Sequence, residues 1–212
     1  MFTSYAIYIL ASQNKLSIED HIVKYILELN SKFKNIKISD LLNHRSGLTR
    51  TVYNYLEKAP HLTYSSNEII SAVNKTDLAF QPNESFQYSN VGYSLLDIII
   101  EKVTSQTYDV AMKNLIFSPL GLKQTSHEIE GHIISGIASG YNYLEGKTLK
   151  SEHENKSHVL AAGSIVSSIN DLYRFSQEII KGTLLTRVLH QQYLTLDQNF
   201  RTHGGLNLEL HF

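Results

Sequence analysis

The chain of 212 residues is 42% hydrophobic and 18% charged, with a formal net charge of −1 at pH 7, a composition typical of a globular protein with a sizeable core. Without a broad basic field it should not bind nucleic acid, and without cysteine it cannot form disulfide bonds or thiolate metal sites. Its longest apolar stretches, 5–11 and 95–100, are far shorter than the roughly 20 residues of a membrane-spanning helix, so we expect no transmembrane segment.

The apolar periodicity predicts a mainly helical chain with few strands. The expected helices run, in chain order, from residue 2 to a turn at 14–15, and then over 18–29, 40–43, 66–73, 91–104, 108–116 and 168–180. The segment 91–104 is apolar around most of its circumference, which indicates a deeply buried helix. Residues 126–158 are polar, so we expect loops with short strands there.

The tripeptide Tyr88-Ser89-Asn90 is the first candidate site, because it places a phenol and an amide together at a turn that enters the buried helix. Such a phenol can pass a proton to or from a serine nucleophile if a nearby Lys lowers its pKa. The tripeptide alone fits a structural role better, with Asn90 as the N-cap of the helix and Tyr88 as a core aromatic.

The residues around the tripeptide favour the catalytic interpretation. Residues 80–96, FQPNESFQYSNVGYSLL, resemble the second motif region of the class C β-lactamase and DD-peptidase-like serine hydrolases. In that family a Pro-Gly turn, a Phe and a Tyr-x-Asn triplet lead into a Gly-Tyr-x-Leu-Leu helix. Asn83 stands where the family usually has Gly, and Asn tolerates the positive φ that such a turn needs.

Four further segments resemble elements of the same family, in the family's order. They are the Lys-Leu segment 15–20, the loop LLNHRSGL at 41–48, the element FSPLGL at 117–122 with Thr125, and the element AAGSIVSS at 161–168 with Asp171 and Phe175. On these motifs the chain is identified as a member of this family.

The family's nucleophile is the Ser of a Ser-x-x-Lys motif, whose Lys lies one helical turn away and helps to deprotonate it. Residues 1–4, MFTS, match the residues that usually follow this motif, so the resemblance implies that its Lys directly precedes Met1. Two segments of the chain also read Ser-x-x-Lys, Ser12 to Lys15 and Ser31 to Lys34. We interpret both as unrelated to catalysis, because neither has the structural context of the motif.

The family's third motif is His-x-Gly or Lys-Thr-Gly on a strand beside the active site, and its backbone completes the oxyanion hole. The candidate here is His203-Gly204-Gly205, with the N–H of Leu206 as the oxyanion donor. The chain then departs from the family pattern, so a Gly-rich turn is an equally good explanation of these residues.

The resemblance implies an α+β fold of the β-lactamase/transpeptidase type, with a helical lobe packed against an α/β lobe. Residues 1–212 would form a partial domain, mainly the helical lobe with little of the antiparallel sheet. The strands before Ser-x-x-Lys and those after the third motif would be missing. The inward face of the 168–180 helix, with Leu172, Phe175 and Ile179, should then be partly uncovered.

The implied reaction is acyl transfer, in which Ser attacks an amide, lactam or ester carbonyl and water then releases the acyl group. The expected roles are acid/base catalysis for Tyr88, and substrate binding for Asn90, His203, Gly205 and Leu206. The His-x-Gly form is closer to the peptidase and esterase branches of the family. We expect a small-molecule or peptidoglycan-peptide substrate, no cofactor and no metal.

The full-length relative would act outside the cytoplasm, in the periplasm or at the cell surface, and the chain itself carries no recognisable export signal. Without the nucleophile, the chain as given should be inactive. Two alternatives stay open: a non-catalytic protein that binds peptidoglycan or a partner, and a truncated gene product without a function of its own.

Overall fold

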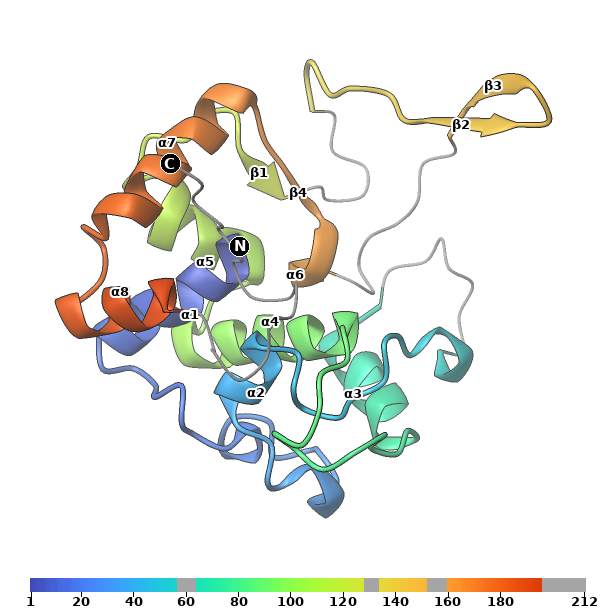
Figure 1. Cartoon of the computed structure of the whole chain (residues 1–212), viewed down its shortest axis with the longest axis vertical. Coiled ribbons are helices and arrows are strands. Elements are labelled where there is room, and N and C mark those ends of the chain that lie inside the picture. Colours follow the sequence, from blue (N-terminus) through green and yellow to red (C-terminus); the bar gives the residue numbers. More distant parts are fainter. Residues whose placement is uncertain (57–63, 128–133, 152–159, 196–212) are drawn as a thin grey trace.

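The computed structural model describes residues 1–56, 64–127, 134–151 and 160–195. Within these ranges the chain is mainly helical (Figure 1). The two helices α1 (Phe2–Ser12) and α4 (Asn90–Thr104) pack against each other. Helix α8 (Arg187–Leu194) packs against α1, while α2 (Ile38–Leu42) and α3 (Ser66–Asn74) pack against α4. These contacts place α1 and α4 at the centre of the helical assembly.

The remaining elements are short, apart from α7 (Ile169–Lys181). They are α5 (Tyr108–Met112) with a π-helical turn at Lys113–Phe117, α6 (Leu160–Gly163), and 3₁₀ turns at Ile22–Lys24, Ser31–Phe33 and Tyr53–Tyr55. The described strands form two separate antiparallel pairs. In the first, β1 (Ser126–His127) pairs with β4 (Ile165–Val166); in the second, β2 (Tyr141–Leu144) pairs with β3 (Lys147–Lys150). The β2–β3 hairpin extends away from the helices in Figure 1.

Helix α4 begins and is buried for reasons visible in its sequence. The Ser89 hydroxyl caps its first turn by accepting a hydrogen bond from the Gly92 N–H at 3.1 Å. Most of its apolar residues are buried, as the sequence predicts: Val91, Leu95, Leu96, Ile98, Ile99 and Ile100. The helix ends at Ser105, which adopts the left-handed conformation with φ 54°.

Helix α7 packs on α1 through aromatic side chains. Phe2 stacks on Phe175 with ring centroids 4.1 Å apart, and Tyr5 meets the same ring edge-on at 5.5 Å. The Tyr5 hydroxyl donates a hydrogen bond to the buried Glu178 carboxylate at 2.6 Å. The expectation of an uncovered inward face is therefore wrong for Phe175 and Ile179, which are both buried, whereas Leu172 is 40% exposed.

Two of the family-like motif residues, Thr125 and Asp171, tie the loop before β1 to α7. The buried Asp171 carboxylate accepts hydrogen bonds from the Gln124 N–H at 2.7 Å and from the Thr125 hydroxyl at 3.0 Å. At the start of the same helix, Ser168 and Asp171 have the spacing of a capping box, and the Ser168 hydroxyl accepts from the Asp171 N–H at 3.3 Å. These residues stabilise the scaffold.

The helix expected over 18–29 is wrong, since only the 3₁₀ turn Ile22–Lys24 forms there. The backbone of this segment bonds to a neighbouring segment instead. The Ile22 N–H donates to the Ile36 carbonyl at 2.9 Å, and the Ile38 N–H donates to the Asp20 carbonyl at 3.0 Å. Tertiary hydrogen bonds thus override the helical spacing of the apolar residues. No helix in the described part of the chain has both the length and the apolarity needed to cross a membrane.

Candidate functional site

Tyr88, Ser89 and Asn90 form the turn that enters α4. Ser89, not Asn90, is the N-cap, and Asn90 is the first residue of the helix. The Tyr88 side chain is 42% exposed, so it is not a core aromatic. The expected N-cap role of Asn90 is therefore wrong. Tyr88 and Asn90 place a phenol and an amide on either side of Ser89, at the start of the buried helix.

The turn is held by a second loop, residues 44–50, which runs beside residues 79–90. Hydrogen bonds join the two loops at Arg45–Asn83, His44–Gln87, Gly47–Ala79, Thr49–Ser89 and Arg50–Asn90, with donor–acceptor distances between 2.7 and 3.0 Å. Asn83 has φ 70°, which confirms that Asn can replace the family's Gly at this turn. Gly47 has φ 75°, and a Cβ there would lie 2.1 Å from the Phe80 carbonyl oxygen, so this close approach requires glycine.

His44 holds the turn from the interior of the protein. It is 3% exposed, and its Nδ1 accepts a hydrogen bond from the Ser89 N–H at 3.1 Å. Because Nδ1 accepts, the neutral ring carries its proton on Nε2. Burial, and to a lesser extent the positive charge of the Met1 amino group, lowers the pKa of His44 to about 4, so the ring is neutral at pH 7.

Aromatic rings enclose His44 and connect it to the candidate catalytic phenol. The His44 ring centroid lies 4.6 Å from that of Tyr88, and it stacks on Tyr93 at 5.1 Å. The Arg50 guanidinium lies 5.7 Å from the Tyr88 ring centroid, within the range of a cation–π contact. The sequence pattern pointed to His44 only as a match to a family loop. Its role in holding the turn depends on a contact with Ser89, 45 positions further along the chain.

The two Ser-x-x-Lys segments occupy other places in the fold. Ser12 is the last residue of α1, and its hydroxyl accepts a hydrogen bond from the Thr186 N–H at 3.0 Å. Ser31 begins a three-residue 3₁₀ turn. Neither serine lies at the N-terminus of a buried helix, which is where the motif would have to place its nucleophile.

The candidate third-motif residues His203, Gly205 and Leu206 lie outside the described residues, so their assignment stays a prediction. Within the described ranges, no group of three or more His, Asp or Glu side chains is arranged to hold a metal ion.

Comparison with known proteins identifies the family. The family model described as Beta-lactamase matches residues 1–210, and the chain therefore belongs to the β-lactamase family of penicillin-binding-protein-like serine hydrolases. Penicillin-binding protein 4* of Bacillus subtilis is 28% identical over 201 residues, which cover 88% of this chain and 44% of that protein. Protein flp of Staphylococcus aureus (strain MRSA252) is 30% identical over 151 residues, 69% of this chain and 30% of that protein. The chain thus spans less than half the length of these curated relatives.

Solved structures confirm the expected fold class. A D-stereospecific amidohydrolase from Streptomyces sp. superposes with a TM-score of 0.82 at 22% identity, over 96% of this chain and 65% of that one. The D-amino acid amidase from Ochrobactrum anthropi SV3, solved in complex with L-phenylalanine amide, gives a TM-score of 0.77 at 26% identity, over 89% and 55%. The chain has the α+β, β-lactamase/transpeptidase-like fold and consists mainly of helices.

Proposed function

We propose that this chain is part of a serine hydrolase that transfers the acyl group of an amide, lactam or ester to a serine and then to water. The observation that carries the proposal is the Tyr88–Asn90 turn, whose phenol is exposed while its backbone is held by the 44–50 loop. A rigid turn with an accessible phenol is what proton transfer at a reacting serine requires, because catalytic groups must be held in the productive geometry.

Each residue of the turn has a distinct role in this proposal. Tyr88 is the general acid/base, and Asn90 orients the substrate through its side-chain amide. Ser89 and His44 do not touch the substrate; they position Tyr88 through the Ser89 N–H to Nδ1 hydrogen bond. The third-motif candidates His203, Gly205 and Leu206 would line the pocket and supply the oxyanion donor.

The nucleophile belongs, in this proposal, to a longer protein in which Ser-x-x-Lys directly precedes Met1. The match of residues 1–4 to the residues that follow the motif supports this placement. The amidase that superposes on the chain was solved with an amino acid amide, which supports an amide of an amino acid, such as a peptidoglycan peptide, as the substrate class. Such a substrate would place the full-length protein outside the cytoplasm.

The proposal is tested by active-site labelling of two proteins, the 212-residue chain and the product of the reading frame extended upstream. A fluorescent penicillin and a fluorophosphonate probe should label only the extended protein, at the serine of the upstream motif. Loss of the nucleophile costs on the order of 10⁶ in rate where catalytic residues act as a unit, so the chain alone should stay unlabelled.

Mass spectrometry of the labelled peptide decides between the alternatives. Stoichiometric labelling of the short chain at Ser12 or Ser31 would show that the nucleophile has been misassigned. An extended protein without Ser-x-x-Lys, or one that neither probe labels, would favour the non-catalytic alternative.

A further inference from the structure

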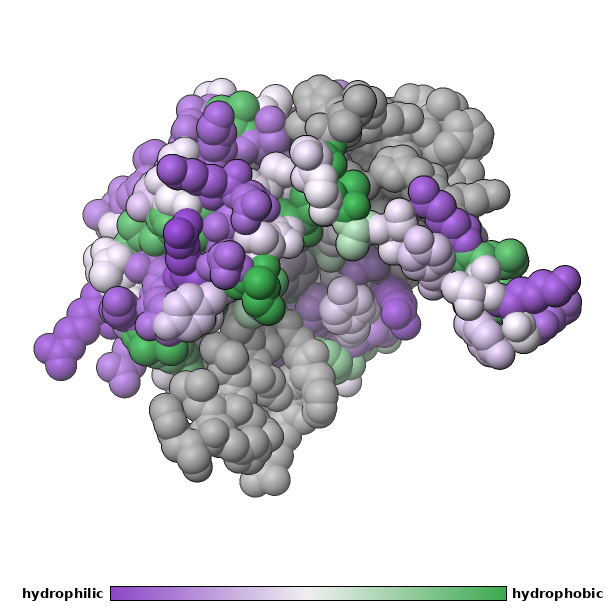
Figure 2. Space-filling view, turned by 90° about the horizontal axis from the view of Figure 1, so that it is seen from above, coloured by the Kyte–Doolittle hydropathy of each residue, from purple (hydrophilic) through white to green (hydrophobic). Residues whose placement is uncertain are grey.

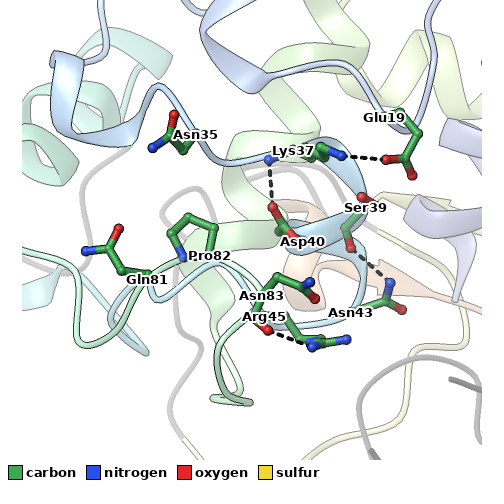
Figure 3. Close-up of a pocket in the computed structure, with 10 residues that line it drawn as sticks. All are labelled: Glu19, Asn35, Lys37, Ser39, Asp40, Asn43, Arg45, Gln81, Pro82 and Asn83. Carbon is green, nitrogen blue, oxygen red and sulfur yellow. Dashed lines mark hydrogen bonds and ion pairs between the residues drawn. The ribbon is translucent and has the colours of Figure 1, made fainter. Parts of the chain in front are cut away.

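A pocket lies next to the two loops that hold the Tyr88 turn, and Tyr88 is not among the residues that line it. It is a pocket of about 490 Å³ between the segment 19–45 and the turn 81–83 (Figure 3). Among the described residues that line it, Pro82 is the one apolar side chain, and the others carry amide, hydroxyl or charged groups. Its volume is in the range of small-ligand sites, but such sites are usually mainly apolar. The lining therefore indicates a strongly hydrophilic ligand.

The charged groups of the pocket neutralise one another. The Lys37 ammonium pairs with the Glu19 carboxylate at 2.9 Å, and the Asp40 carboxylate accepts from the Lys37 backbone N–H at 2.8 Å. The Arg45 guanidinium donates to the Asn83 carbonyl at 2.7 Å. Two cations and two anions give no net charge, so the pocket has no net electrostatic attraction for a phosphate, a carboxylate or a metal cation.

What the pocket presents instead is a set of neutral groups that both donate and accept hydrogen bonds. The Asn35 and Gln81 side chains are exposed at its rim, and the Ser39 hydroxyl is half-buried in its wall. An amide offers a donor and an acceptor side by side, which matches a pair of neighbouring hydroxyls on a sugar ring. The half-buried Pro82 ring supplies an apolar surface for the C–H face of the same ring.

We infer that this pocket binds a neutral oligosaccharide. The binding does not depend on acyl transfer or on the upstream nucleophile, so it is separate from the proposed reaction. Arg45 and Asn83 belong both to the pocket and to the two loops that hold the Tyr88 turn. A saccharide in the pocket would therefore be bound to the same loop pair that carries the candidate catalytic phenol.

The inference is tested by titrating the isotope-labelled 212-residue chain with chitotriose and with maltotriose, and following backbone amide resonances by NMR. At millimolar saccharide we expect shifts at Lys37, Ser39 and Asn83, which line the pocket. The double variant Asn35→Ala/Gln81→Ala should bind about 5- to 150-fold more weakly, because two hydrogen-bonding side chains are lost at about 0.5–1.5 kcal/mol each.

The matched control is the double variant Asn67→Ala/Asn142→Ala, which removes two exposed amides outside the pocket and should bind as the parent chain does. The two saccharides separate recognition of acetamido groups from recognition of hydroxyls alone. The inference is overturned if neither saccharide shifts the pocket resonances, or if the Asn35→Ala/Gln81→Ala variant, folded by the same spectra, keeps full affinity. A response to inorganic phosphate or to glycine without a response to saccharide would identify an ion or zwitterion site instead.

Discussion

Adjacent residues of the Tyr88–Asn90 turn face opposite environments. Tyr88 exposes 42% of its side chain, while Ser89 is 1% exposed, with its hydroxyl bonded to the Thr49 carbonyl at 2.7 Å. The buried residue fixes the backbone and the exposed residue presents its functional group. This division keeps the backbone of the turn fixed while the Tyr88 phenol stays accessible.

Replacing Tyr88 by Phe, which removes the hydroxyl, tests the proposed role of the phenol in proton transfer. In the upstream-extended protein, Tyr88→Phe keeps the ring that lies 4.6 Å from His44, so the fold should be unchanged by circular dichroism and thermal melting. If the phenol transfers the proton, kcat/KM for a generic ester should fall about 10²- to 10⁴-fold. Undiminished turnover would leave Tyr88 as a structural aromatic.

Replacing His44 tests whether this residue holds the backbone of the turn through Ser89. His44→Ala removes the Nδ1 acceptor and the ring contacts, and it places alanine at φ 54°, so the free energy of unfolding should fall by about 2–4 kcal/mol. His44→Asn should cost less, because the Asn side chain can accept from the Ser89 N–H and tolerates positive φ. Urea unfolding of the three proteins at pH 7.5 makes the comparison, and equal losses in both variants would argue against the Ser89 hydrogen bond.

The lowered pKa of His44 also makes the free energy of unfolding depend on pH. The folded pKa of about 4 lies below the ordinary value of 6.5, so the unfolded chain binds the proton first as the pH falls. The stability that His44 contributes is present above pH 6.5 and is lost as the pH falls from 6.5 toward 4. His44→Asn should remove this part of the acid sensitivity, whereas unchanged pH profiles would mean that other groups cause it.

Helix α4 combines a mostly apolar surface with one polar stripe that is buried at its centre. Asn90, Ser94, Asp97 and Glu101 follow one another at helical spacing. The Glu101 carboxylate accepts from the Tyr108 N–H at 3.0 Å, whereas the 2%-exposed Asp97 has a buried carboxylate oxygen without a hydrogen-bond partner. Burial raises the pKa of Asp97 well above its usual range, and the neighbouring Glu101 and Asp109 add to the increase.

The raised pKa of Asp97 predicts that this residue destabilises the fold as the pH rises. Its folded pKa exceeds the unfolded one, so its contribution is most favourable at low pH and is lost as the pH rises through the folded pKa. Asp97→Asn keeps the shape without the charge, and it should raise the free energy of unfolding by about 1–3 kcal/mol at pH 8 and flatten its pH dependence.

The control for this prediction is Asp77→Asn, because Asp77 is 94% exposed in a surface ion pair with Lys32 and should change stability little. Denaturant unfolding of the parent chain and both variants, from about pH 5 to about pH 9, provides the measurement. A less stable Asp97→Asn variant would show that the fold uses the carboxylate.

At the scale of the whole molecule, one helix presents apolar residues to solvent. Ile169, Tyr173 and Ile180 on α7 are 82%, 64% and 53% exposed, and helical spacing places them on one side of the helix, next to the face of the buried Phe175 and Ile179. Figure 2, which shows the molecule from above relative to Figure 1, shows hydrophobic residues scattered among hydrophilic ones on this face. An apolar stripe of this kind favours association.

We therefore expect the 212-residue chain to self-associate as its concentration rises. The triple variant Ile169→Gln/Tyr173→Gln/Ile180→Gln should shift sedimentation toward the monomer while keeping the fold. Leu27→Gln, which changes an 81%-exposed residue outside α7, is the matched control and should have no effect. A parent chain that sediments as a monomer at every concentration would contradict the prediction.

Local signals in the sequence predicted the elements that depend on neighbouring residues. The apolar run after Asn90 predicted the buried helix α4, and the Ser168–Asp171 spacing predicted the cap of α7. The helix over 18–29 failed, since its backbone bonds to residues 36–38. The inward side of α7 was predicted correctly, but its coverage at Phe175 was underestimated, because Phe175 stacks on Phe2, at the far end of the chain.

The sequence by itself determined the family and the position of the Tyr88–Asn90 turn. The reason is that motifs, caps and periodicity each depend on residues that are close together along the chain. Only the tertiary structure decided that His44 holds Ser89 across 45 positions, and that Asn35 and Gln81 line one pocket. The physical reason is that burial and hydrogen-bond partners are set by packing between distant segments. A local pattern does not specify which of those segments meet.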